Sequence, residues 1–190
     1  MPTRVLSIDV GSGNYALCAI TFAEVGAFSV DRLECWRLGD PKATPASGLL
    51  DRLMERFRAW DLWTEGGWRP DKILIEQQVR GAHANMALAF GTYAMLRTLC
   101  PHAEARFVRP ASKFNGFRER LPEQLLLALP PLLLNPPPSN NAVSTHQGRK
   151  RLATSLAEAI LAQTGHPPLA TFCPGQKKDD LADAFLQAFC

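Results

Sequence analysis

The sequence predicts an α/β fold with a five-stranded mixed sheet and helices on both of its faces. Two observations carry this prediction. Three short runs of apolar and β-branched residues follow one another near the N-terminus, which is typical of an antiparallel meander. Farther along the chain, two more such runs alternate with stretches whose apolar residues recur at helical spacing. That alternation indicates parallel strands joined by right-handed crossovers.

Each predicted strand is a short apolar run bounded by turn residues. The expected strands span residues 4–10, 15–22, 28–36, 72–76 and 106–108. The turn between the first two contains Gly11 and Gly13, and glycine tolerates the positive φ angles of tight turns. This turn therefore predicts a hairpin. Residues 72–76 have the composition of a strand that is buried on both faces.

Helices are predicted from apolar residues that recur every three or four positions. They are expected at residues 49–63, 85–99, 147–163 and 180–189, and in part at 112–129. Between them, residues 39–48 and the proline-rich stretch at about 130–144 are expected to be loops. A chain of 190 residues is long enough for a substantial core, and we expect residues 1–190 to form a single domain.

Composition narrows the class of protein. Apolar residues make up 46% of the chain and charged residues 21%, which is typical of a globular rather than a disordered protein. The five cysteines form no C-x-x-C pair, and their scatter favours reduced thiols in an intracellular, reducing compartment. No secretory signal and no membrane-length apolar run is found, so we expect no membrane partner. No motif for an organic cofactor is recognised.

Four carboxylates lie at the ends of predicted elements. Asp9 ends the first strand, Glu76 ends the fourth, and Asp180 and Asp183 begin the last helix. The last two are three residues apart, so they share one helix face. Hard divalent cations bind oxygen ligands of this kind, often together with substrate phosphates. All four acids are therefore predicted to be metal ligands and catalytic residues. Asp179 lies about 100° away on the helix and ranks below them.

Each of these acids also has a simpler interpretation. Asp9 precedes a glycine-rich turn and could only shape that turn, and Glu76 could be an exposed strand end. Asp180 and Asp183 could cap the helix, because acids are favourable at a helix N-terminus. The occurrence of all three motifs in one chain, in this order, favours the metal site.

Basic residues near these motifs are candidate phosphate contacts. The predicted nucleic-acid-binding residues are Arg80, Arg109, Lys113, Arg149, Lys150, Arg151, Lys177 and Lys178, with Arg106, Arg118 and Arg120 as further candidates. Residues 148–151, GRKR, stand at a predicted helix start, where positive charge opposes the helix dipole. Contact with phosphates would explain this placement. The alternative is a solvated basic face and, for Lys177 and Lys178, simple balancing of the neighbouring acids.

Four motifs carry a resemblance to a known family: IDVGSGN at 8–14, ILIEQQ at 73–78, GRKRLA at 148–153 and KKDDLADAF at 177–185. With them, the chain resembles RuvC-type Holliday-junction resolvases of the ribonuclease-H-like superfamily, most closely the poxvirus and mitochondrial branch. In such resolvases one acid ends the first strand, a glutamate ends the fourth, and two acids lie three residues apart on the last helix. The resemblance implies that the matching acids bind Mg²⁺, or Mn²⁺ in its place, with two ions per active site.

The resemblance also implies a function and two partners. It implies an endonuclease that resolves four-way DNA junctions by paired phosphodiester hydrolysis and that acts as a homodimer. Residues 85–99 correspond to the helix that helps to form the dimer in such resolvases, and this stretch is rich in alanine and glycine. A two-fold dimer would match the symmetry of the junction. Packing of this helix within the monomer is the alternative.

Three other functions compete with this one. A ribonuclease-H-like nuclease that acts on RNA or on an RNA–DNA hybrid has the same acids. A nucleic-acid-binding module without catalysis is disfavoured, because all four acids are present. An actin-like or sugar-kinase ATPase also begins with a D-x-G strand, but it needs a second such segment and a second domain. Neither is found in the sequence.

Overall fold

The computed structural model describes residues 1–190 except 24–26, 41–42, 79–81, 135–145 and 173–176. One five-stranded sheet has the strand order β3-β2-β1-β4-β5. Its strands are β1 (Thr3–Asp9), β2 (Tyr15–Phe22), β3 (Phe28–Trp36), β4 (Lys72–Glu76) and β5 (Glu104–Val108). β2 is antiparallel to both β1 and β3, whereas β4 is parallel to both β1 and β5. The predicted meander followed by parallel strands is confirmed.

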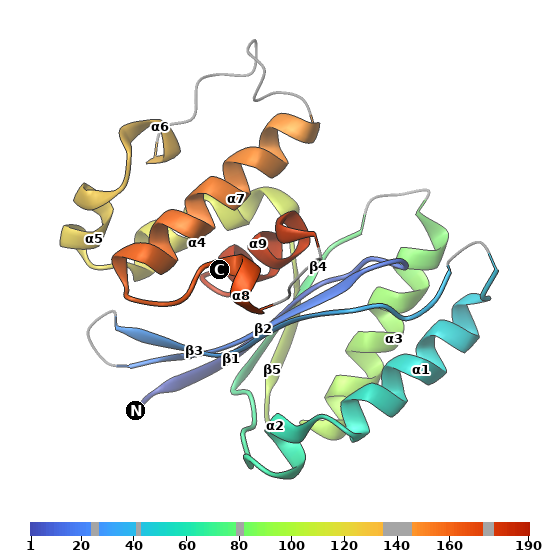
Figure 1. The fold of residues 1–190 in the computed structure, drawn as a ribbon. Coiled ribbons are helices and arrows are strands. Elements are labelled where there is room, and N and C mark those ends of the chain that lie inside the picture. Colours follow the sequence, from blue (N-terminus) through green and yellow to red (C-terminus); the bar gives the residue numbers. More distant parts are fainter. Residues whose placement is uncertain (24–26, 41–42, 79–81, 135–145, 173–176) are drawn as a thin grey trace.

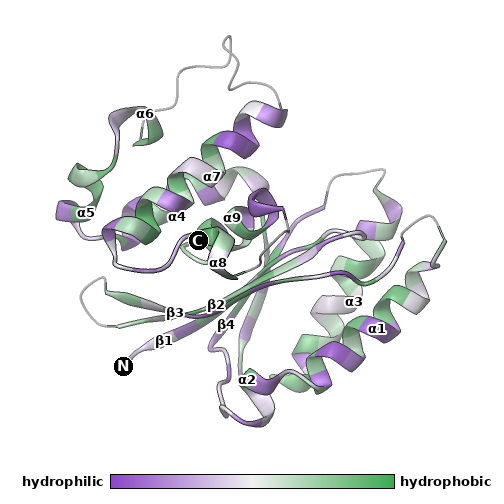
Figure 2. Ribbon diagram, viewed as in Figure 1, coloured by the Kyte–Doolittle hydropathy of each residue, from purple (hydrophilic) through white to green (hydrophobic). Residues whose placement is uncertain are grey.

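Helices cover both faces of this sheet (Figure 1). One face carries α1 (Ala46–Arg58), α2 (Asp61–Thr64) and α3 (His83–Leu99). The other carries α4 (Lys113–Arg120), α5 (Glu123–Ala128), α6 (Pro131–Leu134), α7 (His146–Gln163), α8 (Leu169–Phe172) and α9 (Lys178–Gln187). Figure 2 shows hydrophobic residues along the strands and hydrophilic residues at the N-terminal turns of α7 and α9.

The central strand β1 contributes to two hydrophobic cores. Val5 packs into the core beneath α7 and α9, whereas Leu6 and Ile8 pack into the core beneath α1 and α3. Successive side chains of a strand point to opposite faces, so a strand that is covered on both faces needs apolar residues at consecutive positions. This is why Val5 and Leu6 of β1 are apolar neighbours, although the polar residue Ser7 is buried as well.

Two expected elements differ from the prediction. The helix expected at 49–63 is interrupted, because Trp60 adopts an extended backbone (φ −69°, ψ 113°) and buries its indole at 4% exposure. The result is two helices, α1 and α2. The proline-rich segment begins with the short helix α6 instead of a loop, and the rest of it, residues 135–145, lies outside the described residues.

The small residues of α3 are explained in part by contacts within the monomer. A Cβ atom on Gly91 would clash with the side chain of Leu50, so glycine is needed here for α3 to pack closely on α1. The close approach at Gly91 is therefore between α3 and α1 of the same chain. Any dimer contact of α3 must use its other, outward side.

No disulfide joins the four cysteines that the structure describes. Cys18, Cys35, Cys100 and Cys190 are all free thiols, and the first three are buried. In the described ranges, no helix has both the length and the apolar character needed to cross a membrane.

A buried glutamine connects α9 to the two strands at the middle of the sheet. Gln187 is only 3% exposed. Its side-chain amide donates hydrogen bonds to the carbonyl oxygens of Ile8 (3.0 Å) and Leu74 (2.9 Å), which belong to β1 and β4. This side chain therefore fixes the height and the rotation of α9 over the sheet.

We expect Gln187→Met to lower the free energy of unfolding by about 1–3 kcal/mol, the cost of leaving buried polar groups without a partner. Methionine keeps the length of the side chain but cannot donate the two hydrogen bonds. Urea unfolding would measure the loss. Gln163→Met, at the exposed end of α7, is the matched control and should change stability little. Equal effects of the two substitutions would contradict a specific role for Gln187.

Candidate active site

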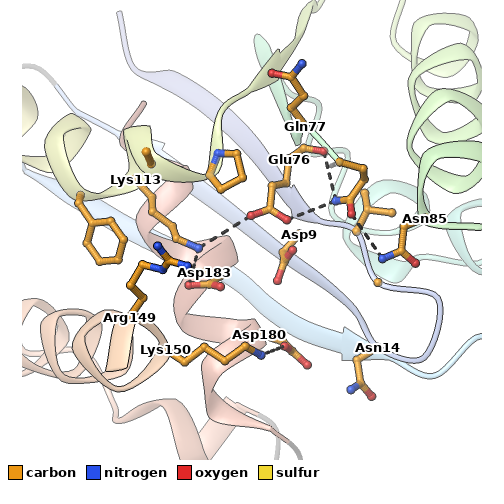
Figure 3. A pocket seen from close by; sticks show the side chains of 16 residues that line it. Asp9, Asn14, Glu76, Gln77, Asn85, Lys113, Arg149, Lys150, Asp180 and Asp183 are labelled. Atoms are coloured by element: carbon orange, nitrogen blue, oxygen red, sulfur yellow. Dashed lines mark hydrogen bonds and ion pairs between the residues drawn. The ribbon is translucent and has the colours of Figure 1, made fainter. Parts of the chain in front are cut away.

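The sheet and α9 bring the four predicted acids together. In the parallel β1–β4 pair, Ile8 is in register with Ile75, so Asp9 and Glu76 emerge at the same end of adjacent strands. Asp180 and Asp183 precede Gln187 by seven and four residues, which places them on the helix face that Gln187 holds against the sheet. All four carboxylates line one cavity of about 620 Å³ (Figure 3).

Lys113 lies inside this cavity rather than on the open surface. It is 8% exposed and is the first residue of α4. Its ammonium nitrogen lies 2.8 Å from Oδ1 of Asp183 and 3.8 Å from Oε1 of Glu76 (Figure 3). The lysine predicted as a phosphate contact therefore compensates two of the clustered carboxylates.

The cluster concentrates negative charge in a partly buried place. Burial raises the pKa of Asp9 well above its ordinary value, and the charge and hydrogen bonding of Glu76 raise it further. Burial also raises the pKa of Asp183, although Lys113 counters this effect. The pKa of Asp180 is raised by burial and by the charge of Asp179. Burial, and to a lesser extent repulsion between neighbouring acids, therefore disfavours the charged carboxylates, and a bound cation would offset this cost.

A chain of amide side chains supports Glu76. Nε2 of Gln78 donates a hydrogen bond to Oε2 of Glu76 (3.2 Å), and Nδ2 of Asn85 donates to Oε1 of Gln78 (3.4 Å). Oδ1 of Asn85 accepts a hydrogen bond from the backbone N–H of Ser12 (3.0 Å). The chain therefore joins the β1–β2 turn, α3 and the end of β4. No role was predicted for Gln78 or Asn85. The sequence shows only that each is an amide residue that follows Glu76, by two and by nine positions.

Two residues of the GRKR segment reach the cavity. Arg149 and Lys150 line it, and both are labelled in Figure 3. Nζ of Lys150 pairs with Asp179 and lies 3.6 Å from Oδ1 of Asp180. Burial alone would raise the pKa of Asp179, but the hydrogen bond and charge of Lys150 bring it below its ordinary value. Asp179 does not line the cavity, in agreement with its lower rank.

The remaining predicted phosphate contacts lie around the cavity or away from it. Arg151, Lys177 and Lys178 line a groove between α7 and α9, with Lys150 at its edge. Arg109 is exposed just before Pro110. Arg80 lies outside the described residues.

Two of the further candidates make contacts within the chain. Arg106 and Arg120 both donate hydrogen bonds to the backbone carbonyl of Cys190, at 3.2 Å and 3.3 Å. They therefore help to hold the chain end that follows α9. The guanidinium of Arg118 lies 5.9 Å from the ring centroid of Phe117.

The donor set of the cavity fits a hard divalent cation. All four acids offer oxygen ligands, which Mg²⁺ and Mn²⁺ prefer. Oδ1 of Asp183 is buried and makes no hydrogen bond of acceptable angle, although the Lys113 ammonium is 2.8 Å away. Among the described residues, no three acidic, histidine or cysteine side chains are close enough to hold one ion as they stand. Small side-chain movements away from the lysines would therefore accompany ion binding.

Comparison with solved structures supports the fold, whereas comparison of the sequence identifies no family. No protein-family model matches the chain, and no curated protein matches its sequence. Solved structures do match. Thermus thermophilus RuvC in complex with a Holliday junction substrate is 16% identical with a TM-score of 0.56, and the match covers all of this chain and 91% of RuvC. A second structure of Thermus thermophilus RuvC is 18% identical with the same TM-score, covering all of this chain and 94% of RuvC.

A eukaryotic protein gives a similar result. Ydc2, the yeast mitochondrial Holliday junction resolvase, is 17% identical with a TM-score of 0.58, and the match covers 98% of this chain and 78% of Ydc2. The strand order and the covering helices are those of the ribonuclease-H-like fold of RuvC. At these identities the similarity establishes the fold, as the sequence predicted.

We expect Mg²⁺ to stabilise the protein through the acid cluster. A ligand at 100 times its dissociation constant adds about 2.7 kcal/mol to the free energy of unfolding if it binds only the folded state. Thermal unfolding with and without Mg²⁺ would measure this gain. Asp9→Asn should abolish most of it, whereas Asp179→Asn should retain it, because Asp179 lies outside the cavity. A gain of equal size in both variants would place the ion elsewhere.

Proposed function

We propose that this protein is a metal-dependent, structure-selective endonuclease that resolves four-way DNA junctions by paired phosphodiester hydrolysis. The observation that carries the proposal is the cavity at the end of β1 and β4, where Asp9, Glu76, Asp180 and Asp183 meet. Lysine and arginine side chains at the same cavity suit a phosphate substrate. The ribonuclease-H-like fold adds support, since structures described as Holliday junction resolvases share it.

Each group in the cavity has a role in this proposal. The four acids would hold the divalent ions, and bound ions would supply activation of a water and stabilisation of the leaving oxygen of a phosphodiester. Lys113 orients the carboxylates of Glu76 and Asp183 and offsets their charge. Arg149 and Lys150 bind phosphate oxygens at the cavity wall. The amides of Gln78 and Asn85 keep Glu76 directed into the cavity.

The proposed active form is a homodimer built on the outward side of α3. Phe90 is a large apolar residue with 60% exposure. Its ring and that of Tyr93 each lie 5.4 Å from the ring of Phe107 on β5, an edge strand of the sheet. A second copy placed here by a two-fold axis would cover this aromatic group. It would also give two active sites for the two strands of a symmetric junction.

Assignment to the poxvirus and mitochondrial branch rests on the sequence motifs alone. The TM-scores of the bacterial RuvC and yeast mitochondrial structures, 0.56 and 0.58, are too similar to separate the branches.

Cleavage should depend on the acid cluster. Asp9→Asn, Glu76→Gln and Asp183→Asn should each reduce Mg²⁺-dependent cleavage of a four-way junction by orders of magnitude, because each removes a charged ligand. Binding of the junction should persist, since most phosphate contacts come from other residues. Gel assays of cleavage and of binding on the same substrates would test both expectations. Near wild-type cleavage by Asp9→Asn would overturn the assignment.

The same cleavage assay distinguishes a junction resolvase from a ribonuclease-H-like nuclease that acts on RNA. Linear duplex DNA and an RNA–DNA hybrid of matched sequence serve as competing substrates. The resolvase proposal expects symmetric nicks in the junction and little cleavage of either control. Preferential cleavage of the hybrid would identify a ribonuclease-H-like RNA nuclease instead.

Phe90→Glu should weaken the dimer, because it places a charge in the proposed interface. Light scattering at micromolar concentration should show a dimer for the wild type and a monomer for the variant. Leu127→Glu is the control, since Leu127 is also exposed (78%) but lies on α5, over the opposite face of the sheet. A monomeric wild type would remove the argument for paired nicking.

A further inference from the structure

A second groove lies beside the active-site cavity, and the sequence analysis did not predict it. Its volume is about 720 Å³. The segment after β3 contributes Arg37, α1 contributes Arg52 and Arg56, and Lys177 lies just before α9. We call this the arginine groove. Asn14, from the β1–β2 turn, lines both the active-site cavity and the arginine groove, so the two hollows are adjacent.

Two of the arginines are held in place by neighbouring groups. Nη1 of Arg52 donates a hydrogen bond to the carbonyl oxygen of Leu38 (2.8 Å), which leaves its other N–H groups available. Gly39 has a φ of +149°, and a Cβ atom there would clash with Nη1 of Arg52. Arg56 has its guanidinium carbon 5.9 Å from the ring centroid of Trp36. A ligand would therefore bind hydrogen-bond donors whose side chains are already partly ordered, which lowers the conformational entropy cost of binding.

The arginine groove carries more positive than negative charge. Arg52 and Arg56 are four residues apart on α1, and like charges at this spacing destabilise a helix. Arg37 is exposed, and in the described part of the chain it makes no side-chain hydrogen bond or ion pair. The four cations outnumber the two acids that also line the groove, Asp40 and Glu55. A bound polyanion would offset this charge.

The geometry also shows how the positive surface continues. Lys177 lines both the arginine groove and the groove between α7 and α9 that contains Arg151 and Lys178. Lys150 lines that second groove and the active-site cavity. The cavity of the acid cluster is therefore adjacent to one basic groove at Asn14 and to another at Lys150.

We propose that the arginine groove binds backbone phosphates of the DNA strand that crosses the active-site cavity, beside the phosphate that is cleaved. This inference rests on the proposed nuclease function and extends it by naming where that strand is held. Contacts of this kind position a strand without reading its sequence, so binding by the groove should be independent of sequence.

Salt dependence of DNA binding tests the proposal. All variants carry Asp9→Asn, and binding to a synthetic four-way junction is measured by fluorescence anisotropy in EDTA over a range of salt concentrations. Arg37→Gln and Arg56→Gln should each flatten the slope of log affinity against log salt by about 0.9, the value per duplex phosphate contact, or about 0.7 for a single strand. Arg58→Gln is the matched control, because Arg58 is exposed on α1 but does not line the groove.

A second measurement locates the contact and guards against misfolding. Arg56 packs on Trp36, so its loss could disturb α1, whereas Arg37 has no such packing; thermal unfolding checks both. Methylphosphonate groups then neutralise one phosphate of the junction at a time. Neutralising a phosphate that the groove binds should weaken junction binding by the Asp9→Asn protein. The same neutralisation should no longer weaken binding when Arg37→Gln is added. Slopes equal to that of Arg58→Gln, or an unchanged methylphosphonate profile, would overturn the proposal.

The outcomes also separate the groove from the nuclease function. If the wild type cleaves junctions with Mg²⁺ but the groove variants keep the control slope, the groove proposal fails and the nuclease stands. If the groove variants flatten the slope and no nucleic acid is cleaved, phosphate binding by the groove stands, whereas the nuclease and the place of the groove beside a cleaved phosphate fail. A protein that binds no DNA overturns both.

Discussion

Repulsion among clustered carboxylates is the constraint around which this end of the molecule is built. Asp9, Glu76 and Asp183 approach one another in a partly buried cavity, and the raised pKa values of Asp9 and Asp183 record the cost. The buried ammonium of Lys113 offsets part of that cost from within the protein. A fold that maintains such a cluster must hold its backbone firmly, because the side chains themselves favour separation.

The packing of α9 on the sheet keeps the backbone that carries these acids in place. Its apolar residues, among them Leu181 and Phe185, are fully buried against the strands. Gln187 adds two directional hydrogen bonds to β1 and β4. Apolar packing alone would tolerate small rotations of the helix, whereas hydrogen bonds to two specific carbonyl groups do not. The orientation of Asp183 and Asp180 is thus set by a residue that lies one turn beyond the first and two turns beyond the second.

Much of the fold could be predicted from the sequence because its signals are local. Apolar runs and turn residues indicate the five strands. The acids stand at the ends of strands or at the start of a helix, so their positions follow from those of the elements. The break of the helix at Trp60 was missed, since a buried tryptophan fits helical spacing and only tertiary packing makes it leave the helix. The burial of Lys113 among the acids was not predicted for a similar reason, since it depends on partners 37 and 70 residues away.

The features that remained hidden combine weak signals from distant segments. Gln78 and Asn85 support Glu76 through a chain of hydrogen bonds that no spacing rule describes. The arginine groove takes residues from four parts of the chain, and its three arginines, from the segment after β3 and from α1, lie outside the recognised motifs. Such sites become visible only when the sheet has fixed which segments are neighbours.

The position of α9 also has a consequence for the order of folding. Asp9 and Gln187 lie almost at opposite ends of the described chain, yet the site requires both. During synthesis, β1 can pair with β2 early, but one face of the sheet stays uncovered until the last helix has left the ribosome. Contacts of such long sequence separation form late and slowly. The chain therefore gains its acid cluster only when its hydrophobic core is closed, so a partly made molecule has no assembled cluster of carboxylates.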